Sequence, residues 1–158
     1  MNYEQFKEIV LGRRSVRKFK ALPVSVEDIR ELIDCARYAP SDTNSQTWQF
    51  IAVINREIIK TIEAMTWEEL NKRAEEAERR GLAREARLLV KSFGPYATAF
   101  SDAPALIVCV ATPYRSKFRD KIFDPIGMVD EAVWAEESIK SSSLAAQNLM
   151  LAAHARGL

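Results

Sequence analysis

Two short segments of this 158-residue chain have the composition of β-strands, and a long helical stretch separates them. Residues 48–54 (WQFIAVI) are rich in aromatic and β-branched side chains. Residues 105–111 (ALIVCVA) form a continuous apolar run, which predicts a strand buried on both faces. A ribbon of only two strands is marginal as a sheet, and the chain ends directly after a helix stop signal, Gly157. We therefore expect one domain over residues 1–158 that lacks its C-terminal part.

Two helices are expected before the first strand. The first covers residues 3–11 and ends at Gly12, and the second begins after Ser25, which is expected to cap it. Pro40 ends the second helix. Its apolar face consists of Ile29, Leu32, Ile33 and Ala36.

The segment between the strands is expected to be a charged helical insert over residues 57–100, with helical periodicity over 57–93 and a break at Gly81. Glutamates placed four residues before a basic residue add roughly 1–2 kcal/mol of helix support. These pairs are Glu68–Lys72, Glu69–Arg73, Glu75–Arg79 and Glu76–Arg80. Two interpretations stay open, a solvated helix pair and a lid over a site.

After the second strand, residues 113–129 contain Pro125 and Gly127 and are expected to form a loop. Residues 130–156 then form the last helix. This helix is apolar nearly all round and rich in small residues that permit close packing, so we expect it in a core or at a subunit interface.

The charge balance excludes several classes of partner. Lysine and arginine number 23 against 22 acidic residues, a formal charge of +1, whereas nucleic-acid and membrane-surface binders need a basic excess. The N-terminus lacks the apolar stretch of a signal peptide and no run of 18 apolar residues occurs, so we expect a cytoplasmic protein. Cys35 and Cys109 are expected to be reduced core residues.

Arginines are concentrated in one segment, residues 13–17 (RRSVR), which follows the first helix as a turn. The planar guanidinium group suits phosphate oxygens, and the hydroxyl of Ser15 adds a donor. This segment is therefore a candidate phosphate site, and the alternative is a short solvated basic run.

A second candidate is the polar segment from Pro40 to Trp48. Asn44 and Gln46 each offer amide donors and an acceptor, which suit the edge of a heteroaromatic ring. The alternative is a plain polar turn between a helix and a strand.

Other chemistries find no support in the sequence. The single histidine, His154, stands in the last turn of the apolar helix, where interaction with the helix dipole accounts for it better than a catalytic triad does. No cluster of metal ligands is seen, and neither G-x-G-x-x-G nor a P-loop is present.

Three blocks, in this order and spacing, resemble the FMN-dependent nitroreductase family. They are residues 13–17, residues 39–50 (APSDTNSQTWQF) and residues 145–158 (AAQNLMLAAHARGL). The middle block is close to the family pattern P-S-S-x-N-x-Q-P-W-x-F, with Asp42 in place of a serine and Thr47 in place of the proline. The resemblance spans almost the whole chain.

This resemblance implies an α+β fold of the nitroreductase type, a three-layer α/β/α sandwich with a central, mostly antiparallel sheet. It also implies a homodimer with FMN in clefts at the subunit interface. One block would hold the FMN phosphate and ribityl chain and reach the pyrimidine edge of the flavin: Arg13, Arg14, Ser15 and Arg17. The other would meet the flavin, partly from the other subunit: Pro40, Ser41, Asn44 and Gln46.

The activity implied is that of an NAD(P)H-dependent FMN oxidoreductase. NADH or NADPH would deliver hydride to the flavin N5, and an electron-poor small molecule, a nitroaromatic or a quinone, would then be reduced in a ping-pong cycle. The flavin carries the chemistry, so no catalytic residue and no metal ligand is assigned.

Two departures from the family bear on function. The family continues past the last helix into a glycine-bearing turn near the flavin N5, further strands and an arm around the partner. The charged part of the insert, residues 67–91, is long for the plainest members and stands where some branches have a lid, but it lacks the Glu-x-x-x-Tyr pattern of the dehalogenating branch.

Alternative functions remain open. Within the fold they are reductive dehalogenation, azoline oxidation and flavin consumption in cofactor synthesis. Outside enzymology, the alternative is a non-catalytic phosphate-binding or interaction module.

Overall fold

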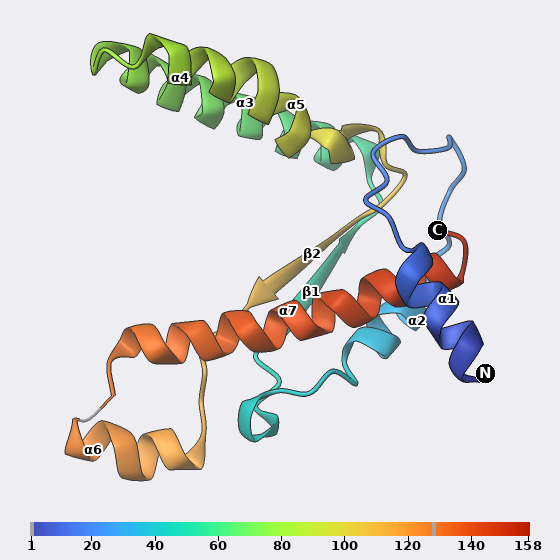
Figure 1. Cartoon of the computed structure of the whole chain (residues 1–158), viewed down its shortest axis with the longest axis vertical. Helices are drawn as coiled ribbons and strands as arrows, with labels where there is room; N and C mark the ends of the chain where they lie inside the picture. The colour runs from blue at the N-terminus through green and yellow to red at the C-terminus, as the bar shows by residue number, and fades with distance from the viewer. Residues whose placement is uncertain (1, 128) are drawn as a thin grey trace. The chain divides into compact units, whose positions relative to one another are not determined.

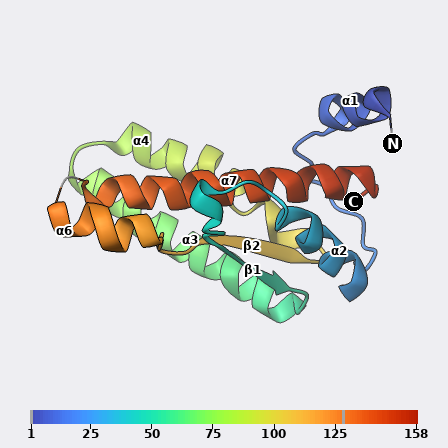
Figure 2. The same ribbon diagram turned by 90° about the horizontal axis from the view of Figure 1, so that it is seen from below.

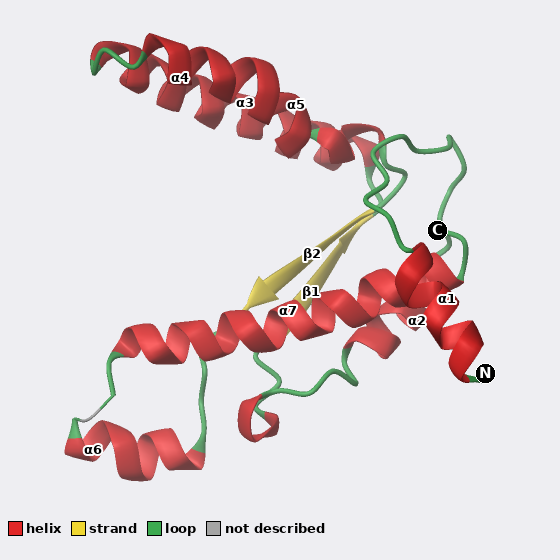
Figure 3. Ribbon diagram, in the orientation of Figure 1, coloured by secondary structure: helices red, strands yellow, loops and turns green. Residues whose placement is uncertain are grey.

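The chain divides into two compact units, which a computed structural model describes over residues 2–127 and 129–158. The first unit contains residues up to Arg14, residues 25–51 and residues 107–158. The second contains residues 15–24 and 52–106. Helices form most of both units, and the described residues include one ribbon of two strands (Figure 3).

The first unit is built around α7 (Glu131–Ala155), the long helix that the sequence predicts over residues 130–156 (Figure 1). Asp130 caps it, because its side chain accepts a hydrogen bond from the backbone N–H of Ala132 at 2.8 Å. α1 (Tyr3–Gly12) and α2 (Val26–Ala36) both pack on α7. Both lie toward its C-terminal end (Figures 1 and 2).

The cap and the apolar face of α2 agree with the sequence prediction. The Ser25 hydroxyl accepts a hydrogen bond from the backbone N–H of Asp28 at 3.0 Å. The buried residues of the apolar face are Ile29, Leu32 and Ala36. Arg156, directly after α7, donates hydrogen bonds to the carboxylates of Asp28 and Glu31, so ion pairs join the two helices beside the apolar contact.

β1 (Trp48–Val53) and β2 (Leu106–Ala111) form an antiparallel ribbon at the two predicted strand positions. The backbone N–H of Thr112, directly after β2, donates to the carbonyl oxygen of Thr47, directly before β1, at 3.2 Å. The expected burial of β2 on both faces is wrong, since every residue of the strand is at least partly exposed. The physical reason is that two strands cover little of each other, and contact with α7, such as that of Cys109 with the Ser142 carbonyl at 3.6 Å, protects only part of the ribbon.

The second unit consists mainly of a helical hairpin. α3 (Arg56–Arg79) and α4 (Ala83–Leu88) pack together, and the chain reverses between them (Figure 1), where the sequence predicts a break at Gly81. Gly81 has a φ of +80°, a left-handed conformation that glycine adopts without steric cost. A π-helical turn (Leu89–Phe93) and α5 (Gly94–Ala97) follow. Gly94 packs so closely on Trp67 that a Cβ atom there would lie 2.3 Å from the indole ring.

Most of the expected ion pairs along α3 are present. Glu68 pairs with Lys72 at 2.6 Å, Glu69 with Arg73 at 2.8 Å and Glu76 with Arg80 at 2.6 Å. The predicted pair of Glu75 with Arg79 does not form. Arg79 pairs with Glu76 instead, at 2.6 Å. One glutamate thus faces two arginines near the end of α3.

The expectation of a loop over residues 113–129 is wrong in its middle. Residues 119–123 form a π-helical turn that continues into α6 (Asp124–Ile126). Pro125 stands just after the junction of the π-helical turn with α6, and Gly127 ends the helix in a left-handed conformation with a φ of +62°. The same two residues that suggest a loop are therefore compatible with a short helix. Met128 lies outside the described residues.

The cysteines are free but less buried than expected. Cys35 is exposed and Cys109 is partly buried, so the prediction of a core position is wrong for Cys35. Burial raises the pKa of the Cys109 thiol. Among the helices of residues 2–127 and 129–158, none has the length and apolar character needed to cross a membrane.

Candidate functional site

The first part of the arginine block lies where α1 ends. The backbone N–H of Arg13 donates to the carbonyl oxygen of Ile9 at 3.2 Å and closes the helix. Arg13 is half-buried and Arg14 is exposed, with its guanidinium group donating to the Arg13 carbonyl at 2.9 Å. Both arginines belong to the first unit.

The second part of the block belongs to the other unit. The Arg17 guanidinium group donates to the Ser15 carbonyl at 3.3 Å and stacks over the ring of Tyr96, with its central carbon 4.8 Å from the ring centroid. Stacking of this kind leaves the edge of the guanidinium group free to bind an anion. Ser15 and Arg17 are both exposed.

The second candidate, residues 40–47, forms a compact turn, which we call the polar turn. The backbone N–H of Asn44 donates to the Ser41 carbonyl at 3.1 Å, and that of Gln46 donates to the Ser41 hydroxyl at 2.9 Å. Both contacts use Ser41, so this residue folds the turn on itself. Pro40, Asn44 and Gln46 are exposed, which leaves the amide side chains available to a ligand.

The backbone of the polar turn is strained. Thr43, Asn44 and Gln46 have φ values of +49°, +56° and +50°. Asparagine tolerates this left-handed region, but for a β-branched residue such as Thr43 it is an outlier. Strain of this kind persists only where the surroundings impose it, and it is concentrated at binding sites.

Contacts to other parts of the first unit hold the polar turn in place. The Asp42 N–H donates to the Ser141 hydroxyl at 3.4 Å, and the Ser142 hydroxyl donates to the Thr47 carbonyl at 2.8 Å. A third contact joins the hydroxyl groups of Thr43 and Tyr114 at 3.0 Å. The middle of α7 and the segment after β2 therefore determine where the turn sits.

Two hydroxyl groups of the polar turn have unused hydrogen-bonding capacity. The side-chain oxygens of Ser45 and Thr47 are buried and find no partner within the described residues. Buried polar atoms without partners usually mark a bound ligand or water. The exposed amides of Asn44 and Gln46 supply donors and acceptors that fit the edge of a flavin ring.

The end of α1 and the polar turn lie at different places along α7. Gly12, just before Arg13, packs so closely on the His154 ring that a Cβ atom on the glycine would lie 2.7 Å from Nε2, whereas the polar turn contacts Ser141. At a rise of 1.5 Å per residue, these two points on α7 are about 20 Å apart. One chain therefore does not bring Arg13 and the polar turn together.

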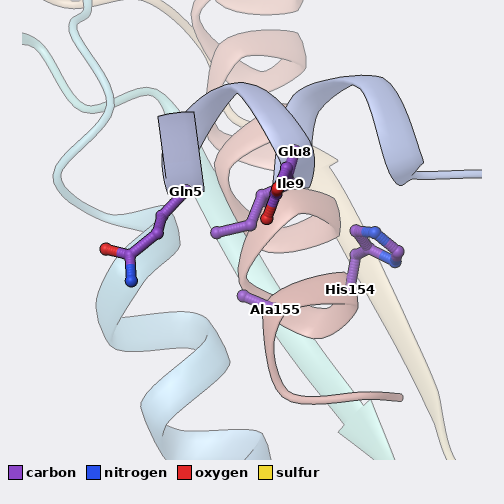
Figure 4. Close-up of a pocket in the computed structure, with 5 residues that line it drawn as sticks. All are labelled: Gln5, Glu8, Ile9, His154 and Ala155. Atoms are coloured by element: carbon purple, nitrogen blue, oxygen red, sulfur yellow. The ribbon is translucent and has the colours of Figure 1, made fainter. Parts of the chain in front are cut away.

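A shallow pocket lies where α1 crosses the end of α7 (Figure 4). Its lining residues are Gln5, Glu8, Ile9, His154 and Ala155. The side chains of Gln5 and His154 lie on opposite sides and point away from each other in Figure 4. Among the described residues, no group of three histidine, cysteine or carboxylate side chains is placed to hold a metal ion.

The sequence analysis missed a buried cluster next to the polar turn. Tyr114 is 2% exposed and its ring stacks on Trp134, with centroids 5.2 Å apart and planes 2° from parallel. Arg119, 8% exposed, donates to the Tyr114 carbonyl at 3.0 Å and pairs with Asp124 and Glu131. Two large aromatic residues were the available signal, Tyr114 inside the supposed loop and Trp134 shortly after it.

Comparison with known proteins identifies the family of this chain. The Nitroreductase family matches residues 10–158. A nitrobenzene nitroreductase from Ectopseudomonas oleovorans is 31% identical over 168 residues, which cover 96% of this chain and 70% of that protein. A protein from Methanothermobacter thermautotrophicus, whose name pairs NADH dehydrogenase with NAD(P)H nitroreductase, is 28% identical over 152 residues, 96% of this chain. The chain spans only 56% of that relative's length.

Solved structures share the fold. A BluB-like flavoprotein from Clostridium difficile superposes with a TM-score of 0.77 at 24% identity, over 93% of this chain and 68% of that one. A nitroreductase with bound FMN from Desulfitobacterium hafniense has a TM-score of 0.63 at 24% identity, over 99% of this chain and 67% of that one. These structures confirm the expected nitroreductase-like α+β fold. With a match over nearly its whole length, the chain belongs to the nitroreductase family.

Proposed function

We propose that this chain is an FMN-dependent oxidoreductase that uses NADH or NADPH to reduce an electron-poor acceptor of the nitroaromatic or quinone type. The observation that carries the proposal is the polar turn, in which a strained backbone presents exposed amide side chains that suit a heteroaromatic edge. FMN, when bound, supplies the two-electron redox chemistry between donor and acceptor. The protein holds the FMN in position, provides positive charge around it and leaves a path for donor and acceptor.

The arginine block is our candidate for the FMN phosphate and ribityl chain. Arg14, Ser15 and Arg17 are exposed, and Arg13 is half-buried. Charge-assisted hydrogen bonds to a phosphate are each worth about 1.5–3 kcal/mol, so a few of them hold a phosphomonoester firmly. An arginine that reaches the pyrimidine edge would also favour negative charge there.

A homodimer would complete the site. The separation of about 20 Å along α7 between the end of α1 and the polar turn keeps Arg13 apart from the turn in one chain. A second copy would allow Pro40, Ser41, Asn44 and Gln46 of one chain to meet the arginine block of the other. The exposed side of α7, on which Ile139, Leu144 and Met150 are the large apolar residues, offers a surface for that association.

We also infer that the helical insert, residues 57–100, acts as a lid over the acceptor. Leu88, Leu89, Phe93 and Tyr96 line an open apolar hollow on the hairpin. Phe93 and Tyr96 are 49% and 60% exposed, and such rings suit an aromatic acceptor. This arrangement favours a lid over a merely solvated helix pair.

The flavin content of the purified protein tests the proposal. We expect a yellow protein that oxidises NAD(P)H in steady state when a nitroaromatic or quinone is added. The double variant Arg14→Ala, Arg17→Ala should lose most of its FMN. The matched control, Lys18→Ala with Lys20→Ala, removes the same charge from the same exposed segment and should stay yellow.

Two outcomes would contradict the proposal. A parent protein that binds no FMN at saturating concentration and oxidises no NAD(P)H would favour the non-catalytic phosphate-binding module. Equal flavin loss in both double variants would show that net charge, not the arginine geometry, holds the cofactor. A yellow protein that nitroaromatics do not reoxidise would instead favour another flavoenzyme activity.

A further inference from the structure

The shape of the polar turn depends on a residue that holds Thr43. Thr43 is exposed and β-branched, yet its φ of +49° is in the left-handed region. A β-branched side chain does not adopt this conformation without an external contact. Thr43 directly precedes Asn44, so its conformation sets the direction of the following amide.

The external contact is Tyr114. Its hydroxyl lies 3.0 Å from the Thr43 hydroxyl, and it comes from a segment 71 residues further along the chain. Tyr114 is only 2% exposed, so the pair joins an exposed residue to a fixed point in the core. The hydrogen bond is half-buried, so water competes with it less than at an open surface.

The position of the Tyr114 hydroxyl is itself fixed from two sides. The ring stacks on Trp134 of α7, with centroids 5.2 Å apart. The Arg119 guanidinium group donates to the Tyr114 carbonyl at 3.0 Å while its other nitrogens pair with Asp124 and Glu131. Backbone and ring are therefore both held, and the hydroxyl cannot follow a moving turn.

We propose that Tyr114 is a positioning residue for the flavin: it holds Thr43 in the left-handed conformation and thereby orients the amides of Asn44 and Gln46 for the ring edge. The part that concerns flavin rests on the proposed function. Tyr114 itself need not touch the cofactor. Its role is to order the turn before the ligand arrives, which lowers the entropic cost of binding.

The variant Tyr114→Phe tests this role because it removes the hydroxyl and keeps the stacked ring. Hydrogen exchange of the apoprotein reports the order of the turn, and FMN titration of the same protein reports affinity. We expect faster amide exchange over residues 42–47 and an FMN Kd raised about 3- to 10-fold, the range of one neutral hydrogen bond. The control Ser138→Ala removes another buried hydroxyl, which bonds to the Trp134 carbonyl at 3.2 Å, and should leave both readouts unchanged.

Substitutions at Thr43 separate the contact from general destabilisation. Thr43→Val should match Tyr114→Phe, Thr43→Ser should retain parental affinity, and the double variant Tyr114→Phe, Thr43→Val should lose no more than either single variant. Faster exchange without a change in Kd, or additive losses in the double variant, would overturn the positioning role. If the parent binds no FMN, the proposed function fails, and exchange over 42–47 alone decides whether Tyr114 anchors the turn.

Discussion

Hydroxyl groups outside the polar turn maintain its backbone conformation. Left-handed conformations at non-glycine residues cost about 1–3 kcal/mol each, and the turn has them at Thr43, Asn44 and Gln46. Ser141 and Ser142 on α7 offset part of this cost through their contacts with Asp42 and Thr47. The serines of α7 thus do more than permit close packing, because they hold a candidate cofactor loop.

Removal of one of these hydroxyls should be measurable as lost stability. The Ser142 hydroxyl lies 2.8 Å from the carbonyl oxygens of both Thr47 and Ser138. Ser142→Ala leaves the Thr47 carbonyl without this donor and should lower the free energy of unfolding by about 1 kcal/mol. Urea unfolding followed by circular dichroism measures it.

Ser143→Ala is the matched control. The Ser143 hydroxyl is exposed and donates only within α7, to the Ile139 carbonyl at 2.7 Å. Its loss should change the free energy of unfolding by less than about 0.5 kcal/mol. Equal effects of the two substitutions would show that the contact with Thr47 contributes nothing.

The residues of the polar turn could be singled out from sequence because their chemistry is local: amides and hydroxyls follow one another between a helix and a strand. Tyr114 could not, since its partner Thr43 is 71 positions away and no periodicity links them. Arg119 could not be predicted from sequence for a related reason. Its helical turn forms around contacts with Tyr114 and Glu131, which a local pattern does not encode.

At the scale of elements, the sequence predicts those whose ends have their own signals. Ser25 begins α2, Gly81 breaks the insert and Asp130 begins α7 close to the expected positions. The segment after β2 is the exception, because Pro125 and Gly127 are compatible with either a loop or a short helix. Tertiary contacts, which the sequence pattern does not show, select the short helix.

The ion pairs between α2 and Arg156 should make the packing of α2 on α7 dependent on pH. The Ser25 hydroxyl, followed by Arg156, lowers the pKa of Asp28 below its usual range. A carboxyl whose pKa is lower in the folded state stabilises the protein fully above the unfolded pKa, about 3.9, and loses this contribution as the pH falls through the folded value. The Tm difference between the parent and Asp28→Asn should therefore be constant at neutral pH, narrow below about pH 4 and vanish at still lower pH.

Glu27→Gln serves as the control for this titration. Glu27 stands in the same first turn but faces Arg30 of its own helix at 3.5 Å, with both side chains largely exposed. Such an exposed pair contributes little to stability. The Tm of Glu27→Gln should therefore follow that of the parent at every pH. A difference between parent and Asp28→Asn that persists at the lowest pH would contradict the role of the charged carboxylate.

At the scale of the whole molecule, burial is the property that the sequence predicts least well. The apolar run of β2 was expected to be covered on both faces, yet Val108 is 37% exposed in the single chain. α7 likewise buries one side and exposes another: Ile139 is 58% and Leu144 47% exposed. Burial depends on which surfaces meet, and a second copy of the chain is our proposed partner for α7.

Leu144→Glu tests that partner. In a twofold interface each substitution acts in both copies, and loss of a buried leucine costs roughly 1.5–3 kcal/mol per copy. The dimer Kd should therefore rise by at least about 100-fold. Analytical ultracentrifugation measures the change, and FMN should be lost in parallel because each site needs both chains. The control Leu82→Glu alters a residue of the hairpin with the same 47% exposure and should leave the dimer intact. If Leu144→Glu stays dimeric, this side of α7 is not the interface, and if the parent is a monomer that binds FMN tightly, one chain completes the site alone.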